Sequence, residues 1–408
     1  MTAAEGRRDW WIAGSASITM LGATSLTAIL VGTTAPAFGP DVGISDAELG
    51  VAASGFWLAA ACSAWVIAPQ ASRWGWRRTA IVGMGLAAVG QLGLAVGLRN
   101  AVTLTVLMAL IGLTYGVVVP TSNVVVAEEV PRRRHGLLLG MKQGAAPVGG
   151  IIAGGLVPLA VAVDWRWAFV GAAAITLLAL ANTVAVRPRP TRGTDLPGAV
   201  RTPLRSVVKP MARMVAAGAG LATMSIAVLS AYSARTLVDS GLSLHAAGLV
   251  VLIASVASLG TRLFSGWWAD LHDSDGFVPA AGLVLVGGVG MVLISSGRAE
   301  VVVPGVIMTF ASGWGWPALL LLGILRQAPE ATAYVASRFQ VGTGIGGACG
   351  PATFGFIVSS QGLGAAWVVA ALTAVPAAAC MFWVSTVVRR HERPTRDLTS
   401  YELDGGAS

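Results

Sequence analysis

Charged side chains are scarce in this sequence, and their scarcity argues against a soluble protein. Only 11% of the 408 residues are Asp, Glu, Lys or Arg, whereas 55% are hydrophobic. Soluble domains average about 25% charged residues. Most of this chain therefore needs lipid around it, and we expect an integral membrane protein.

Enzyme motifs are also missing. The sequence contains no H-E-x-x-H, no G-x-S-x-G and no P-loop pattern. Residues 342–347 match G-x-G-x-x-G, but they lie inside an apolar run and follow no strand, so a dinucleotide site is not expected. We therefore expect neither an enzyme nor a bound cofactor or metal.

Cysteines are few, and acids are missing from the middle of the apolar runs. Cys62, Cys349 and Cys380 lie in apolar runs without a C-x-x-C pair, which predicts buried thiols and no disulfide. None of the 19 Asp and Glu residues lies deep within such a run. This argues against proton coupling through a carboxylate inside the membrane.

Long apolar runs are what the sequence has in abundance. A membrane-spanning helix needs about 20 apolar residues, and the 52 glycines fit helices that pack closely in lipid. The sequence therefore predicts an all-α membrane protein with twelve transmembrane helices. The runs cover residues 11–38, 47–70, 79–98, 101–127, 136–161, 165–186, 214–238, 246–269, 278–296, 301–325, 331–359 and 364–388.

The 27 Lys and Arg residues are distributed unevenly between the loops. Most fall in the loops on the side of the N-terminus, and only four fall on the opposite side: Arg99, Arg166, Arg235 and Arg298. By the positive-inside rule both termini are cytoplasmic, and a bacterial inner membrane is the expected location. Contact with anionic lipid explains the net charge of +8, so no nucleic-acid partner is expected.

The sequence repeats itself about 200 residues apart. Residues 43–50 read GISDAELG and residues 241–248 read GLSLHAAG, while Gln143-x5-Gly149-Gly150 matches Gln340-x5-Gly346-Gly347. Pro120 also matches Pro317. We interpret the chain as two pseudo-symmetric six-helix halves, 1–186 and 214–388. A basic linker, 187–213, joins them, and a polar tail, 389–408, follows.

The repeated phrases predict two helix caps. Ser45 and Ser243 precede apolar runs and are suited to cap the helices that begin there. Asp41 and Asp239 lie near the same positive helix ends. The alternative is that these two acids belong to an outer gate.

Several local motifs resemble those of the major facilitator superfamily. Residues 68–78, APQASRWGWRR, are similar to the loop between its helices 2 and 3, with Ser72 in place of the acid and Trp76 in place of an Arg. GWWAD at 266–270 is similar to the second copy, and GAAPVGG at 144–150 approaches the helix 5 motif. Position 108, near which the family has an Arg, is Met. The matching gating residues are Arg73, Gly75, Arg77, Arg78, Pro147, Gly149, Gly150, Gly266 and Asp270.

The resemblance implies a monomeric transporter whose halves rock about a site near the middle of the bilayer. It also implies that Asp270 meets the start of helix 5, near Arg132 to His135, and latches the outward-facing state. The alternative is that Asp270 is a solvated loop acid.

Three cations lie inside the apolar runs: Lys142, Arg262 and Arg338. A charge at a helix centre costs about 2.5–3.5 kcal/mol on insertion scales, and these cations have no obvious acidic partner in the sequence. They predict an anionic substrate. Oxalate/formate-type exchangers of the family use basic residues in helices 8 and 11, which resembles Arg262 and Arg338. The alternatives are a structural Arg262 and two cations that snorkel to the cytoplasm.

The predicted function is transport of a small organic anion, with the bilayer and the substrate as partners. Moving an anion inward against the membrane potential costs about 2.3 kcal/mol per 100 mV, which favours exchange or export with a proton or counter-substrate. Gln143, Gln340, Tyr115 and Trp316 complete the predicted substrate site. The alternative is efflux of apolar or cationic compounds, which is suggested by the aromatics Phe56, Trp57, Tyr115, Tyr232, Trp314 and Trp316.

Overall fold

The computed structural model describes residues 5–66, 74–131, 134, 138, 141–187, 208–272, 274–327 and 332–388. This part of the chain is helical throughout and contains no strand. The helices are α1 (Glu5–Val42), α2 (Asp46–Val66), α4 (Trp76–Gly97), α5 (Ala101–Glu129), α7 (Ala145–Ala162), α8 (Arg166–Ala185), α9 (Val208–Asp239), α10 (Leu244–Leu271), α11 (Phe277–Ile294), α12 (Ala299–Gly313), α13 (Trp316–Gln327) and α14 (Thr332–Leu372), followed by a helix over 374–388.

Among the described residues, eleven segments are long and apolar enough to cross a membrane. The last segment, Tyr334–Val388, has 55 residues and would be about 80 Å long as one straight helix, far more than a bilayer core of about 30 Å. Gly362 interrupts it with φ 87°, so this segment makes two crossings. The twelve predicted crossings are thereby confirmed.

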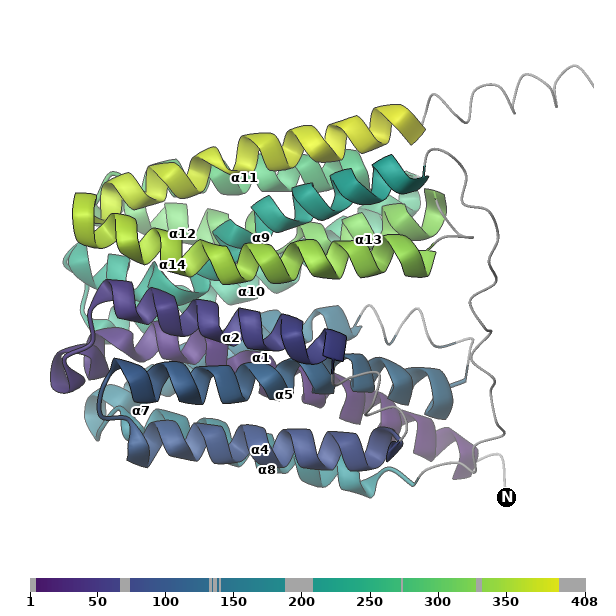
Figure 1. Ribbon diagram of the computed structural model, residues 1–408, viewed down its shortest axis with the longest axis horizontal. Helices are drawn as coiled ribbons and strands as arrows, with labels where there is room; N and C mark the ends of the chain where they lie inside the picture. The colour runs from purple at the N-terminus through teal and green to yellow at the C-terminus, as the bar shows by residue number, and fades with distance from the viewer. Residues whose placement is uncertain are drawn as a thin grey trace, which may run out of the picture.

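The six crossings from α1 to α8 form one bundle, and the six from α9 to residue 388 form the other. Figure 1 draws the first bundle from purple to blue-green and the second from teal to yellow. We call the end of the bundles where α1 begins and the helix over 374–388 ends the terminal end, and the opposite end the distal end. The bundles meet chiefly where α2 packs on α14, α7 on α10, and α1 on α9. α9 begins at Val208, inside the stretch that the sequence analysis assigns to the linker.

Glycines bring the two bundles into contact. At Gly50 of α2, an added Cβ would lie 2.3 Å from the carbonyl oxygen of Pro351 in α14. At Gly154 of α7, it would lie 2.6 Å from the carbonyl oxygen of Gly248 in α10. Backbones approach this closely only where a side chain is missing. The small residues of the sequence therefore place the bundles directly against each other.

The two predicted helix caps are confirmed. The Ser45 hydroxyl accepts a hydrogen bond from the Glu48 amide at 3.3 Å, and the Ser243 hydroxyl accepts one from the Ala246 amide at 3.2 Å. The Glu48 carboxylate in turn accepts a bond from the Ser45 amide at 2.8 Å, which completes a capping box. The repeated phrase thus begins the same kind of helix in each bundle.

The prediction of buried thiols is wrong for two of the three cysteines. Cys62 and Cys349 are exposed, and Cys380 is partly buried. Hydropathy identifies the run in which a cysteine lies, but in a membrane helix the outward face is as apolar as the inward face. Composition therefore does not show whether a cysteine lies on the outward or the inward face of its helix.

Candidate functional site

The tenth crossing is broken at Trp314 and Gly315, between α12 and α13. Gly315 packs against α10, where an added Cβ would lie 3.3 Å from Cγ2 of Thr261. Pro317 is tolerated because it falls in the first turn of α13, where no amide donor is needed. Breaks in membrane helices persist only where protein or a cavity covers them. The free amides of the α13 first turn give this place a partial positive charge.

Arg262 lies beside this break. It is 8% exposed, and its guanidinium carbon is 5.9 Å from the centre of the Trp314 ring. Nη1 donates a hydrogen bond to the backbone carbonyl of Gln143 in the other bundle, while Nε is buried without a partner. In the part of the chain that the structure describes, no carboxylate lies within 4.0 Å of Arg262. Among the described residues, the charge is therefore buried without a counter-charge.

Other polar atoms near Arg262 also lack partners. Nε1 of Trp314 and the hydroxyls of Ser255 and Ser258, which precede Arg262 by about two turns and one turn of α10, are buried and unpaired. Most buried Ser and Thr hydroxyls of the described helices bond a carbonyl one turn earlier, as Ser265 does to Arg262. The Arg and Trp nitrogens are donors only. This cluster therefore needs an acceptor.

Tyr115 lies in the other bundle, within electrostatic range of Arg262. Its ring packs against Phe56 at a centroid distance of 5.4 Å and against Trp57 at 5.9 Å. Trp57 in turn occupies the space that Gly347 of α14 leaves open, 2.7 Å from an added Cβ. An aromatic group therefore lies between the bundles close to the buried cation.

Lys142 bonds to α5 of its own bundle. It lies in a short helical turn, residues 141–143, and is 4% exposed. Nζ donates hydrogen bonds to the side-chain oxygen of Asn123 and, at 3.5 Å, to the carbonyl of Val119, both on α5 of the same bundle. Both partners are neutral. Asn123 was missed by the sequence reasoning, although an amide within an apolar run is a signal that could have found it.

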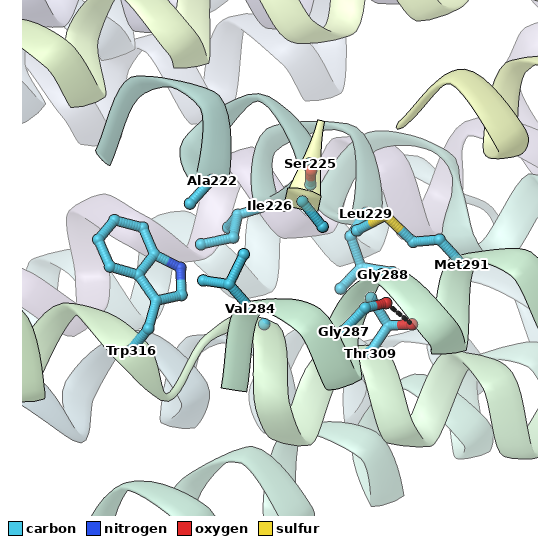
Figure 2. Close-up of a pocket in the computed structure, with 12 residues that line it drawn as sticks. Ala222, Ser225, Ile226, Leu229, Val284, Gly287, Gly288, Met291, Thr309 and Trp316 are labelled. Atoms are coloured by element: carbon cyan, nitrogen blue, oxygen red, sulfur yellow. Dashed lines mark hydrogen bonds between the residues drawn. The ribbon is translucent and has the colours of Figure 1, made fainter. Parts of the chain in front are cut away.

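The remaining predicted substrate residues lie elsewhere. Arg338 and Gln340 are exposed on α14, where the Arg338 guanidinium lies 5.3 Å from the Tyr334 ring centre. Trp316 is 1% exposed, packs on Phe339 and lines a small cavity of about 10 Å³ inside the second bundle, shown in Figure 2. Such a cavity holds about one water molecule. The described contacts do not join these three residues to Arg262.

At the distal end, the two acids predicted for a gate bond within their own bundles. Asp41 accepts a hydrogen bond from the Trp165 indole at 3.0 Å, and Asp239 pairs with Arg235 on the same helix at 3.5 Å. Asp46 makes the cross-bundle contact. Its carboxylate lies 3.4 Å from Nε of Arg235.

Two further hydrogen bonds join the bundles at the same end. The Tyr232 hydroxyl donates to the carbonyl of Asp46 at 2.5 Å. The hydroxyl of Ser54 accepts a bond from the Ala352 amide at 2.9 Å. The sequence reasoning missed Asp46, Arg235 and Ser54 as residues that join the bundles. Asp46 is an acid in only one copy of the repeated phrase, and this difference was the available signal.

At the terminal end, most of the predicted latch lies outside the described residues. This applies to Arg73, to Arg132, Arg133 and His135, and to the side chain of Asp270, whose backbone lies in the last turn of α10. Gly75, with φ 79°, precedes α4. The remaining predicted residue, Gly266, has open space beside it.

The described residues of the first motif hold the terminal end of the first bundle together. The Arg77 guanidinium donates to the carbonyl of Val184 at 2.7 Å, and Arg78 is exposed. The Trp76 indole, which stands in place of a family Arg, donates to the buried Glu129 carboxylate at 3.1 Å. A neutral donor thus meets this acid where the family motif has a cation.

Residues 144–150, which approach the family's helix 5 motif, lie at the start of α7 and pack against α10. We call the contact between residues 143–157 and residues 248–262 the α7–α10 seam. An added Cβ at Gly150 would lie 2.3 Å from the Ser255 hydroxyl, and one at Gly149 would lie 3.4 Å from the backbone of Leu26. Pro147 is buried in the first turn of α7. An apolar groove of about 430 Å³, lined by Met141 and Leu263 among others, runs beside this seam.

Comparisons with known proteins agree with this architecture. The sequence model of the Major Facilitator Superfamily matches residues 14–326. No curated protein matches the sequence. Among solved structures, the nucleoside transporter NupG is similar with a TM-score of 0.73 and 13% identity, over 91% of this chain and 99% of that chain.

Two further solved structures have the same fold. A D-xylose–proton symporter matches with a TM-score of 0.70 and 17% identity, over 91% of this chain and 96% of that one. A bacterial homolog of the human lysosomal transporter Spinster, inward-facing and occupied, matches with a TM-score of 0.70 and 15% identity, over 93% and 97%. These identities establish the fold alone. With its matching family model and its two six-helix bundles, the chain belongs to the Major Facilitator Superfamily of transporters.

Proposed function

We propose that this transporter moves a small organic anion, with Arg262 as the residue that binds the anionic group. The observation that carries the proposal is a buried guanidinium without a carboxylate partner among the described residues. A buried charge of this kind is strongly unfavourable unless a counter-charge reaches it. A substrate carboxylate is such a counter-charge, and it forms stronger hydrogen bonds with Arg than a neutral group does.

The unpaired atoms around Arg262 support an anion over a cation. Nε of Arg262 and Nε1 of Trp314 are donors only, and the Ser258 hydroxyl also lacks a partner. A carboxylate supplies only acceptors, so it matches the cluster. A cationic substrate would leave these donors unpaired and would face the Arg262 charge.

Efflux of apolar or cationic compounds is the second candidate. The group of Phe56, Trp57 and Tyr115 favours it, because aromatic faces attract cations and apolar rings. The proximity of Tyr115 to Arg262 instead suits an anion with an apolar part. Tyr115 and Gln143 complete the proposed site, and Lys142, Arg338, Gln340 and Trp316 remain predictions from the sequence.

In this proposal the terminal end faces the cytoplasm, because the basic loops lie there. The distal contacts at Asp46 and Ser54 then close the outer side, which corresponds to an inward-facing state. An anion that leaves the cell moves with the membrane potential, whereas uptake opposes it. Export or exchange, with a proton or a counter-substrate, is therefore the proposed direction.

Transport by purified protein in liposomes tests the proposal. Short mono- and dicarboxylates are offered with and without an imposed potential, and lipophilic cations are offered in parallel. We expect carboxylate flux that Arg262→Gln lowers by roughly 10- to 100-fold, since a charged hydrogen-bond partner is lost. Arg166→Gln is the matched control, because Arg166 is an exposed distal arginine that pairs with Asp164, and its flux should equal that of the wild type.

Two results would contradict the anion model. One is unchanged carboxylate flux in Arg262→Gln. The other is flux of lipophilic cations with no carboxylate transported by the wild type, which would support the efflux candidate instead.

A further inference from the structure

The carbonyl that holds Arg262 is available because of a proline. In an α-helix the carbonyl of Gln143 would accept a hydrogen bond from the amide of residue 147, but residue 147 is Pro and has no N–H. The neighbouring backbone bonds are made: Gly144 donates to the Met141 carbonyl at 3.0 Å, and Val148 donates to the Gly144 carbonyl at 3.2 Å. A partly buried carbonyl that lacks its helical donor still needs a partner, and the guanidinium of Arg262 supplies one.

This bond lies at one end of the seam between α7 and α10. Towards the distal end, Gly154 packs against Gly248 and Gly150 against Ser255. Towards the terminal end, the bond from Arg262 to Gln143 lies just before the start of α7, next to the contact of Leu259 with Gly144. The same guanidinium is therefore both the proposed anion-binding group and a link between the two bundles.

A carbonyl and a substrate carboxylate compete for this guanidinium on unequal terms. The bond from Arg262 to the carbonyl has one ionised partner, whereas a carboxylate brings a second charge and binds Arg through two parallel N–H donors. Nε of Arg262 is still unpaired while Nη1 bonds the carbonyl. A carboxylate that engages both terminal nitrogens takes Nη1 from the carbonyl and makes two bonds where the carbonyl makes one, so it is the better partner.

We infer that Arg262 exchanges the Gln143 carbonyl for the carboxylate of the substrate, so that anion binding releases this end of the α7–α10 seam. Pro147 is the positioning residue, because its missing N–H keeps the carbonyl available to Arg262. The inference rests on the proposed anion transport. In the exchange, the anion binds more tightly when the Arg262–Gln143 bond is broken than when it is formed. This difference in affinity is the condition for a ligand to shift a conformational equilibrium.

The test is Pro147→Ala, which returns an N–H donor to the Gln143 carbonyl and favours the helix. Pro158→Ala, on the same α7, is the matched control. Spin labels at Met141→Cys and Leu263→Cys report the seam, since both positions are exposed beside it. The background replaces Cys62, Cys349 and Cys380 by Ala. The added ligand is oxalate, and binding is followed by the fluorescence of the tryptophans.

Without ligand, we expect a larger population of long label distances in Pro147→Ala than in the wild type and Pro158→Ala. Oxalate should lengthen the distances in the wild type and Pro158→Ala. It should change them little in Pro147→Ala, which should bind oxalate roughly tenfold more tightly because the competing carbonyl is occupied. Arg262→Gln should give long distances and no response to oxalate.

The two proposals fail separately. If Pro147→Ala and Pro158→Ala give the same distances and the same oxalate affinity as the wild type, the exchange is refuted, although carboxylate transport dependent on Arg262 still stands. If both Pro147→Ala and Arg262→Gln lengthen the distances but no carboxylate binds or moves, the anion function is refuted and the exchange with it.

Discussion

Two of the seams between the bundles are built from the same two kinds of repeated helix. The phrase at 43–50 begins α2 and the phrase at 241–248 begins α10, whereas the Gln-x5-Gly-Gly pattern lies at the start of α7 and within α14. α2 packs on α14, and α10 packs on α7. Each seam therefore pairs one helix of each kind, and any difference between the seams comes from individual side chains rather than from the fold.

The difference lies in how polar groups are satisfied. In the α2–α14 seam, the Ser54 hydroxyl accepts a bond from Ala352. In the α7–α10 seam, the hydroxyl of Ser255 is buried without a partner, and Arg262 bonds a neutral carbonyl. A buried unsatisfied group costs about 1–3 kcal/mol. The Ser54 hydroxyl in the first seam is therefore satisfied, whereas the second seam keeps polar groups that the proposed substrate could satisfy.

The largest predicted effect comes from bulk introduced into either seam. Gly50→Leu and Gly154→Leu place side chains where an added Cβ already lies 2.3 Å and 2.6 Å from a backbone oxygen of the other bundle. Both variants should prevent the distal end from closing and should reduce transport by more than about tenfold, because overpacking of this kind costs about 1–3 kcal/mol or more. The reactivity of a cysteine introduced at Asp41 measures closure of the distal end, and substrate flux measures transport.

Gly155→Leu is the control for this prediction. It lies next to Gly154 on α7, but nothing stands within 4 Å of an added Cβ. Its labelling and flux should match the wild type. If the distal end closes as fully in Gly154→Leu as in Gly155→Leu, and the two variants transport equally well, the close approach of α7 and α10 is not required for function.

A smaller effect on the population with a closed distal end should differ in sign between serine substitutions in the two seams. Ser54→Ala removes a satisfied hydroxyl and should lower the closed population by roughly two- to tenfold. Ser255→Ala removes an unsatisfied one and should leave the closed population unchanged or raise it. Distances between spin labels across the distal end measure both, and Ser265→Ala is the control because its hydroxyl bonds within α10. A loss of closure in Ser255→Ala equal to that in Ser54→Ala would remove the contrast.

Much of the fold was predictable because it depends on length and local chemistry. The twelve crossings follow from apolar runs of sufficient length, and the caps at Ser45 and Ser243 follow from a hydroxyl just before such a run. The turn at Gly362 falls between the last two predicted runs. The break at Trp314 was not predicted, because in lipid a glycine followed by a proline is compatible with a continuous helix.

The candidate site was less predictable because it depends on which way each side chain points. From the sequence alone, Lys142, Arg262 and Arg338 are equally good candidates for the substrate site, because each is a cation within an apolar run. Packing directs Lys142 towards Asn123 and leaves Arg338 exposed. Arg262 alone among these three lies beside a helix break with unpaired donors around it. The bond to Gln143 crosses 119 positions of sequence, so no local pattern reports it.

The smallest predicted effect concerns the ion pair of Asp46 and Arg235. Their side chains are 25% and 37% exposed, and partly exposed pairs contribute about 0.2–1 kcal/mol. Asp46→Asn should therefore lower the closed population at the distal end by about 1.5- to 5-fold, and the effect should shrink at about 1 M salt, where the screening length falls to about 3 Å. Spin-label distances at two salt concentrations measure this.

The charge-swapped double variant, Asp46→Arg with Arg235→Asp, sharpens the same prediction. The swap keeps an opposite-charge pair across the α2–α14 seam, but it places the new carboxylate of α9 near Asp239, whose wild-type partner is the Arg235 guanidinium at 3.5 Å. We therefore expect partial recovery of closure relative to either single variant. Arg298→Gln is the control, because its pair with Glu300 is exposed and lies within one bundle. Equal closure in Asp46→Asn and Arg298→Gln at low salt would mean that hydrogen bonds and packing close the distal end, and that the ion pair adds nothing to the difference between the seams.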